Sequence, residues 1–210
     1  MKFDADPRLY NELWVRSSIP ERRRVVFSLL IDLSGSMSGG KSQAALLGTI
    51  LMAETLAQLK VPFAVNGFQD VVIPFAPFHA HFGESLRRDI ATMPQEVEEL
   101  RPGGNNHAGH NDDGPCVLQA ANELLAEPAD QRILIVVSDG QPAGLHSSEE
   151  DLRWTIRGLS SPDAPLELLG IGLGPSTQHV TDYYPRSVAE VPVARFAHEI
   201  GALICRGLGI

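Results

Sequence analysis

The sequence predicts an α/β domain with a doubly wound, mostly parallel central sheet and helices on both of its faces. Segments of strand length alternate along the chain with segments of helical periodicity, which is the pattern of an open sheet covered on both sides. The strand segments are apolar at almost every position, as strands buried on both faces are. The chain has 210 residues, 43% of them hydrophobic. This length supports one large hydrophobic core rather than two.

The expected strands are apolar segments that end at glycine, proline or polar residues. In order they are VVFSLLID (25–32), PFAVNGF (62–68), VVIPF (71–75), RILIVVSDG (132–140), LELLGIGLG (166–174) and the short edge element SVAEVPV (187–193). The expected helices have apolar residues at helical spacing or helix-start signals. They are 41–59, Glu84–Thr92, Pro115–Leu125, Ser148–Leu159 and Ala194–Leu208. Residues 101–114 hold four Gly, three Asn and two His, which predicts a loop.

The composition limits the function classes. Residues 1–22 are polar and mixed, and we expect an N-terminal arm there, followed by one domain over 23–210. The net charge of −9 argues against nucleic-acid binding, which depends on neutralising phosphates. The longest apolar runs are far shorter than the ~20 residues of a membrane-spanning helix. The two cysteines form no C-x-x-C motif. We therefore expect a cytoplasmic protein that binds neither nucleic acid nor a membrane.

Three polar clusters are expected at one edge of the sheet, because ligands in such folds bind beyond the carboxyl ends of the strands. They are DLSGS after the first strand, SDG after the strand at 132–137, and the loop at 103–114. In the first cluster Asp32, Ser34 and Ser36 are two residues apart, so that both hydroxyls can turn toward one point. Asp139 adds a second carboxylate. Oxygen ligands of this kind suit Mg²⁺, and the same donors would accept another divalent cation such as Mn²⁺ or Ca²⁺.

The motif D-x-S-G-S-M, with S-D-G after a later strand, resembles the metal-ion-dependent adhesion site (MIDAS) of von Willebrand factor A (vWA) domains. The further segments N-D-D-G, R-I-L-x-x-x-S-D-G-x-P, G-I-G-x-G and V-T-x-Y-Y are similar to the C-terminal A domain of the cobaltochelatase CobT subunit. The resemblance covers roughly residues 25–208. It implies a vWA fold and the metal residues Asp32, Ser34, Ser36 and Asp139, with a further ligand from N-D-D-G. Asn111 stands in the place of the family's usual Thr there, and Asp113 is the alternative.

The resemblance also implies a function. Such domains are not the catalyst; they recruit a protein partner that supplies an Asp or Glu carboxylate to the metal. They work beside an AAA+ ATPase of the MoxR/CobS-like kind, as in cobaltochelatase-type complexes. On this hypothesis Lys41 is simply an exposed residue near the start of a helix.

Two other hypotheses remain open at this point. Gly35–Ser42 reads GSMSGGKS, which fits the phosphate-binding P-loop, and it stands between an expected strand and an expected helix. In a P-loop NTPase, Lys41 would contact the phosphates, Ser42 the Mg²⁺, and Asp139 would be the acidic residue of the second strand. The third hypothesis is an A domain that binds its partner elsewhere, with the metal motif as a structural relic.

Overall fold

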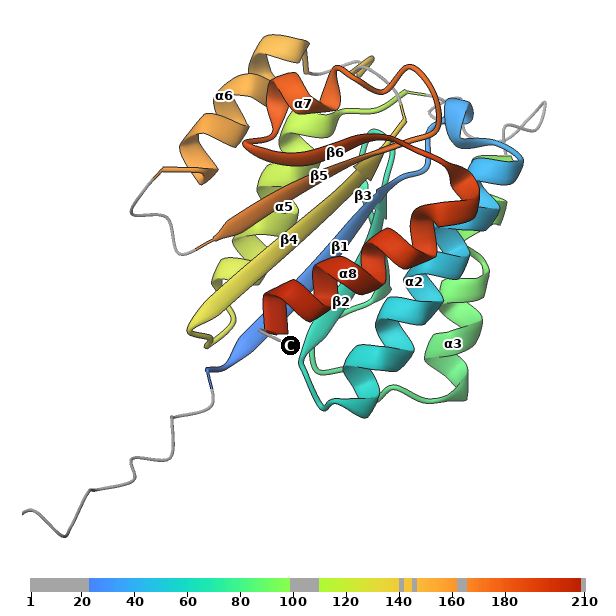
Figure 1. Ribbon diagram of the computed structural model, residues 1–210, viewed down its shortest axis with the longest axis vertical. Coiled ribbons are helices and arrows are strands. Elements are labelled where there is room, and N and C mark those ends of the chain that lie inside the picture. The colour runs from blue at the N-terminus through green and yellow to red at the C-terminus, as the bar shows by residue number, and fades with distance from the viewer. Residues whose placement is uncertain (1–22, 99–109, 140–141, 145–146, 162–165, 209–210) are drawn as a thin grey trace, which may run out of the picture.

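The computed structural model of the protein describes residues 23–98, 110–139, 142–144, 147–161 and 166–208 (Figure 1). Within these ranges six strands form one sheet: β1 (Val25–Asp32), β2 (Phe63–Phe68), β3 (Val72–Ala76), β4 (Gln131–Ser138), β5 (Glu167–Leu173) and β6 (Arg186–Val191). Their order is β3-β2-β1-β4-β5-β6, and every neighbouring pair is parallel except β2 and β3. A tight turn joins β2 to β3, and so short a connection links antiparallel strands only. The doubly wound, mostly parallel sheet expected from the sequence is confirmed.

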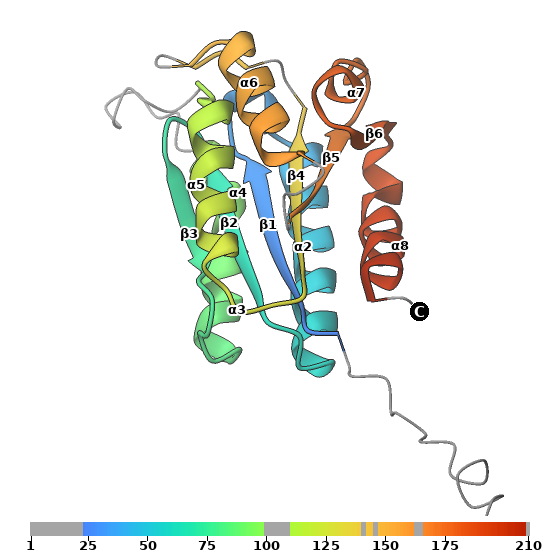
Figure 2. The ribbon, with the colours of Figure 1, turned by 90° about the vertical axis from the view of Figure 1, so that its left-hand side faces the viewer.

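Helices cover both faces of this sheet, as Figure 2 shows. The first face carries α2 (Gly40–Gln58), α3 (Glu84–Ala91), α4 (Met93–Glu98) and α8 (Phe196–Leu208). The second face carries α5 (Asp113–Leu125), α6 (Glu149–Leu159) and the short α7 (Val180–Tyr183). Two 3₁₀ turns, η2 (Gly35–Met37) and η3 (Val193–Arg195), precede α2 and α8. Among the helices in the described ranges, none combines the length and the apolar character needed to cross a membrane.

The short elements were not predicted from the sequence, because one or two turns of helix contain too few residues to show a hydrophobic periodicity. α4, α7 and η2 were not expected. α5 begins at Asp113, two residues before the expected start, so Asp113 and Gly114 belong to the helix and not to the preceding loop. The expected arm at 1–22 and most of the expected loop at 101–114 lie outside the described residues.

β1 shows how the two sides of the core are built. Its side chains alternate between the faces of the sheet. Phe27, Leu29 and Ile31 pack against the α2 and α8 side, while Val26 and Leu30 pack against the α5 and α6 side, and all are buried. By the same alternation the last residue of β1, Asp32, belongs to the α5 side. The strand thereby delivers a carboxylate to the carboxyl edge of the sheet, next to the start of α5.

Candidate metal centre

The ends of β1 and β4 lie side by side at the carboxyl edge of the sheet, where Ile31 pairs with Val137 in the parallel ladder. The residues that follow them, Asp32 and Ser138, are in contact: Ser138 Oγ donates a hydrogen bond of 2.9 Å to Asp32 Oδ2. Asp32 Oδ1 accepts a second hydrogen bond, of 2.8 Å, from the backbone N–H of Ser34. Asp32 is 0% exposed. The register of the sheet and the turn after β1 therefore hold this carboxylate in one orientation.

The two serines of the D-x-S-x-S motif turn toward each other and toward Asp139. Ser34 Oγ lies 3.0 Å from Ser36 Oγ, and Ser36 Oγ donates a hydrogen bond of 2.7 Å to Asp139 Oδ1. Because a hydroxyl has one proton to donate and Ser36 gives it to the carboxylate, Ser34 is the donor in the contact between the serines. The structure thus brings together the four residues that the sequence singled out at this edge, Asp32, Ser34, Ser36 and Asp139. We refer to these four as the Asp–Ser cluster.

Asn111 joins the Asp–Ser cluster to the segment that follows β4. Its Nδ2 lies 3.4 Å from Asp32 Oδ2 as a donor, and its Oδ1 accepts a hydrogen bond of 2.9 Å from the backbone N–H of Ala143. The side chain is buried. The N–H₂ end of the amide therefore faces the carboxylate of Asp32, and the oxygen end is committed to the backbone of Ala143.

The two aspartates after Asn111 have different roles. Asp112 Oδ1 accepts a hydrogen bond of 2.8 Å from the backbone N–H of Ser147, so this side chain holds the segment before α6. A Cβ at Gly144 would lie 1.7 Å from the same oxygen, so only glycine fits there. Asp113 is also buried, but its Oδ2 has no hydrogen-bond partner within the part of the chain that the structure describes. A buried carboxylate oxygen without a donor is costly unless a cation or a water binds it.

The electrostatics of the site reflect this crowding of acids. Burial raises the pKa of Asp32, and the neighbouring charge of Asp139 raises it further, while the hydrogen bonds from Ser34 and Ser138 act in the opposite direction. Burial raises the pKa of Asp113 well above its usual range, with a further contribution from the charge of Asp32. Deprotonated, these carboxylates concentrate negative charge in a poorly solvated place. A bound cation would offset that charge.

The expectation that Lys41 is simply exposed was wrong. Its ammonium forms an ion pair with Asp139 Oδ2 and lies 3.4 Å from the backbone oxygen of Ser36. The physical reason is the compact turn η2, which ends two residues before α2 begins and places the first turn of that helix beside the end of β4. The sequence separation of 98 residues between Lys41 and Asp139 conceals this contact.

Gln69, which follows β2, is a structural residue of the site that the sequence analysis missed. Its Nε2 donates hydrogen bonds to the backbone oxygens of Leu33 at 2.9 Å and Glu96 at 3.2 Å. Its own backbone oxygen accepts from the N–H of Asp112 at 3.0 Å. Gln69 therefore links the turn after β1 to the start of α5. Its position at the carboxyl end of a strand next to β1 is the feature of the sequence that could have indicated this role.

Acidic, histidine and cysteine side chains do not by themselves form a metal-ligand set at the Asp–Ser cluster. In the ranges that the structure covers, no group of three or more His, Cys, Asp or Glu side chains could hold a metal ion by itself. Serine hydroxyls would have to complete any ligand set here.

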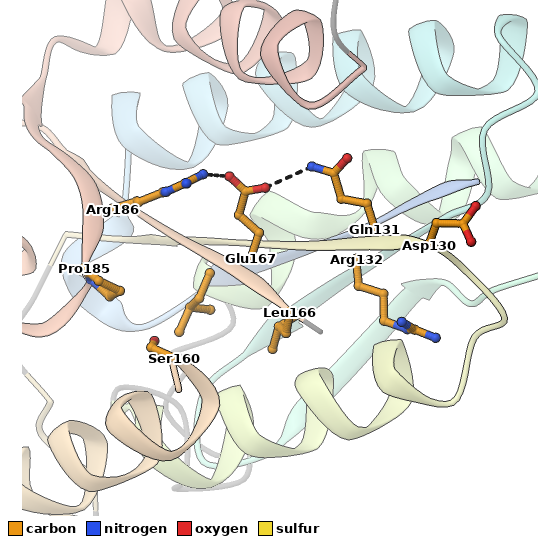
Figure 3. A pocket seen from close by; sticks show the side chains of 9 residues that line it. Asp130, Gln131, Arg132, Ser160, Leu166, Glu167, Pro185 and Arg186 are labelled. Carbon is orange, nitrogen blue, oxygen red and sulfur yellow. Dashed lines mark hydrogen bonds and ion pairs between the residues drawn. The ribbon is translucent and has the colours of Figure 1, made fainter. Parts of the chain in front are cut away.

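A pocket of about 390 Å³ lies at the opposite, amino edge of the sheet, around Gln131, Glu167 and Arg186. In Figure 3 Glu167 lies between the other two and is paired with both, so its carboxylate is already engaged by its own chain.

Comparison with known proteins places the chain in a family. The sequence model described as "Cobalamin biosynthesis protein CobT VWA domain" matches residues 19–77 and 105–208. The uncharacterized protein YojO of Bacillus subtilis (strain 168) is 32% identical over 150 residues, which cover 67% of this chain and 21% of that protein. This chain thus spans about a fifth of the length of that relative.

Solved structures share the fold at low sequence identity. The D319A mutant of the PilB minor pilin from Streptococcus sanguinis has a TM-score of 0.68 and 13% identity, with coverage of 91% of this chain and 63% of that one. A von Willebrand factor type A protein from Catenulispora acidiphila has a TM-score of 0.63 and 18% identity, with coverage of 89% and 43%. These likenesses show the architecture alone. With the family model matching most of the chain, the protein belongs to the family of CobT VWA domains.

Proposed function

We propose that this domain is a non-catalytic protein–protein interaction module that binds one Mg²⁺ at the Asp–Ser cluster and, through the ion, a carboxylate of a partner. The observation that carries the proposal is the convergence of Asp32, Ser34, Ser36 and Asp139 at one point of the sheet edge. The buried Oδ2 of Asp113, which has no hydrogen-bond partner among the described residues and whose carboxyl senses the charge of Asp32, supports it, since such an oxygen fits a cation. Mg²⁺ prefers oxygen ligands of these kinds, and Mn²⁺ or Ca²⁺ would use the same donors.

Asp113, rather than Asn111, is our candidate for the ligand from the start of α5. The N–H₂ group of Asn111 faces Asp32, and a cation would be repelled by an N–H₂ group at that position. Its oxygen is engaged by the backbone of Ala143. Asp113 offers an oxygen that no donor of the described residues reaches, and its pKa is raised first by burial and further by the nearby charge of Asp32. Asn111 then serves as a hydrogen-bond donor that orients Asp32.

The bound ion would be positively charged and could accept a further ligand from another protein. Neutral hydroxyl ligands reduce its charge less than carboxylates do, so it would attract an Asp or Glu from a partner protein. By family membership, we propose that the complex includes an AAA+ ATPase of the MoxR/CobS-like kind, as in cobaltochelatase-type assemblies. This chain's part in such a complex is to bind and orient the partner rather than to perform chemistry.

The geometry of residues 35–42 favours this function over that of a P-loop NTPase. Ser42, the Mg²⁺ ligand of a P-loop, is buried, and its hydroxyl donates a hydrogen bond of 2.9 Å to the backbone oxygen of Gly39. Lys41 is held by Asp139. In η2 the N–H groups of Met37 and Ser38 donate to Ser34 and Gly35, so these amides are committed within the turn.

The test is calorimetric titration of the metal-free protein with MgCl₂, repeated with MgATP. We expect Mg²⁺ to bind with no further effect of the nucleotide. Binding should be lost in the double variant Asp32→Ala/Ser34→Ala and kept in Ser38→Ala, which alters an exposed serine of the same turn. Tight binding of MgATP that depends on Lys41 would instead identify a nucleotide site.

The partner is tested separately, by co-purification with an AAA+ ATPase of the stated kind in Mg²⁺ and in EDTA. The proposal expects capture in Mg²⁺ only. Capture that persists in EDTA and in Asp32→Ala/Ser34→Ala would favour the third hypothesis, an A domain that binds elsewhere on its surface.

A further inference from the structure

We infer that Lys41 is a built-in counter-ion of the Asp–Ser cluster, and that its ammonium weakens Mg²⁺ binding and keeps Asp139 from coordinating the ion directly. The inference deepens the proposed metal site and rests on it.

Lys41 forms a partly buried ion pair, in which its carboxylate partner is the buried member. Its ammonium pairs with Asp139 Oδ2, and the carboxylate side chain is 0% exposed while the lysine side chain is 27% exposed. The ammonium also approaches the backbone oxygen of Ser36 at 3.4 Å. Ser36 Oγ occupies the other oxygen of the same carboxylate at 2.7 Å. Both oxygens of Asp139 are therefore engaged by its own chain.

The surroundings leave space for the lysine side chain at this position. Gly174, at the end of β5, has a positive φ of 88°, and a Cβ there would lie 3.1 Å from Lys41 Cε. Its backbone N–H donates to Val191 of β6, which holds the glycine in place. Most side chains would be strained at such a φ and would crowd the lysine. Three elements, α2, β4 and β5, thus jointly fix the ammonium beside Asp139.

The ion pair of Lys41 with Asp139 changes the net charge that a metal ion meets at this site, and therefore the affinity of the site for Mg²⁺. The charges of Asp139 and Asp113 each act on or respond to that of Asp32, and Lys41 pairs with Asp139 and so offsets one of these negative charges. An arriving divalent cation meets less negative charge, and it is repelled by an ammonium beside its ligands. With both oxygens of Asp139 engaged, this residue acts by orienting the hydroxyl of Ser36.

The test compares Mg²⁺ affinities of the whole chain by calorimetry at one pH and one ionic strength. Lys41→Met removes the charge and keeps the length of the side chain, and we expect its Kd for Mg²⁺ to fall on the order of tenfold, as Coulomb repulsion of this kind predicts. Lys60→Met is the matched control: Lys60 lies beyond the far end of α2, roughly 28 Å away by the rise of a helix. Its Kd should equal that of the wild type, since this separation exceeds the Debye length at ordinary salt.

A second measurement protects the test against a folding defect. In EDTA, Lys41→Met should unfold at a lower temperature than the wild type, because the buried Asp139 loses its cation. Saturating Mg²⁺ should raise its Tm more than that of the wild type. Lys41→Gln is a second neutral variant that can still donate a hydrogen bond to Asp139, and it should behave like Lys41→Met. Lys41→Arg keeps the charge and should keep the wild-type Kd.

The outcomes separate this inference from the proposed function. If the wild type binds Mg²⁺ and the neutral variants bind with the same or lower affinity, the role of Lys41 is overturned while the metal site stands. If the wild type binds no Mg²⁺ under any of these conditions, the metal site itself fails. Tighter binding by both neutral variants, with Lys60→Met and Lys41→Arg unchanged, supports the inference.

Discussion

Ser138 Oγ donates a hydrogen bond of 2.9 Å to Asp32 Oδ2 and so joins two residues that are 106 positions apart in the sequence. The contact closes the carboxyl edge of the sheet between β1 and β4. It also shows how the protein keeps a fully buried carboxylate: Asp32 receives hydrogen bonds from Ser34 and Ser138, and Asn111 approaches it as a third donor. These donors offset only part of the desolvation, since the pKa of Asp32 is still raised.

The first prediction concerns Asp32→Asn. An amide of the same shape buries no charge. Its oxygen can accept from the N–H of Ser34 and its N–H₂ can donate to Ser138 Oγ, but this N–H₂ then faces the N–H₂ of Asn111, so the Tm in EDTA should stay close to that of the wild type. The increase in Tm on adding Mg²⁺ should disappear, because the cluster loses a charged ligand. Scanning calorimetry in EDTA and in Mg²⁺ measures both quantities. The exposed Asp89→Asn is the control and should keep the increase; an undiminished increase in Asp32→Asn would remove Asp32 from the site.

The second prediction is a pH dependence of the metal-free protein. The pKa of Asp113 is raised well above its usual range in the folded state, mainly by burial. The folded state then binds this proton more tightly than the unfolded chain does. The stabilisation is therefore fully present below the unfolded pKa, about 4, and it is lost as the pH rises through the folded pKa. Urea unfolding in EDTA should give a lower free energy of unfolding near pH 8 than near pH 5.

Asp113→Asn isolates the contribution of this residue. The free energy of unfolding of the variant should fall less over the same pH range. The pH dependence that the variant still shows includes the contribution of Asp32, whose pKa is also raised. In the wild type, saturating Mg²⁺ should flatten or reverse the dependence, because the ion binds the deprotonated carboxylates. A variant with the full wild-type dependence would show that Asp113 does not titrate in this way.

The third prediction concerns Gln69→Leu. The substitution removes both side-chain hydrogen bonds and leaves the backbone oxygen of Leu33, next to Asp32, without its donor. We expect a loss of about 1–3 kcal/mol in the free energy of unfolding, as for a buried polar group left unsatisfied. Mg²⁺ affinity should fall as well, since the turn after β1 is no longer tied to α4. Gln119→Leu alters an exposed glutamine on α5 and should change neither quantity; equal effects of the two substitutions would contradict the role of Gln69.

The fourth prediction compares two helical glycines by chemical denaturation. At Gly48 of α2 a Cβ would lie 2.5 Å from Cε1 of Phe196, the first residue of α8. Gly48→Ala should therefore destabilise the protein by about 1–3 kcal/mol, as overpacking does. Gly201 of α8 has nothing within 4 Å of a Cβ, and Gly201→Ala should stabilise it by up to about 1 kcal/mol. Effects of the same sign would contradict the close packing of α2 on α8.

Much of the fold was predictable because its signals are local. Strands buried on both faces are apolar at nearly every position, and this pattern located the expected strands to within a few residues. The spacing of Asp32, Ser34 and Ser36 was equally local. That Asp139 joins them followed from topology, because parallel strands end at the same edge of the sheet. The short helices α4 and α7 and the early start of α5 depend on packing against the sheet, which no local period records.

The sequence by itself determined the α/β architecture, the edge at which polar groups gather and four of the residues that meet there. The tertiary structure decided which atoms face one another. Asn111 turns its amide N–H₂ toward Asp32, and Lys41 pairs with Asp139. Asp113 keeps a buried oxygen that receives no hydrogen bond within the described part of the chain, and Gln69 links the turn after β1 to α4. These relations join side chains from separate elements. The geometry of these contacts depends on how the elements pack against one another, and the spacing of residues within any one segment does not predict that packing.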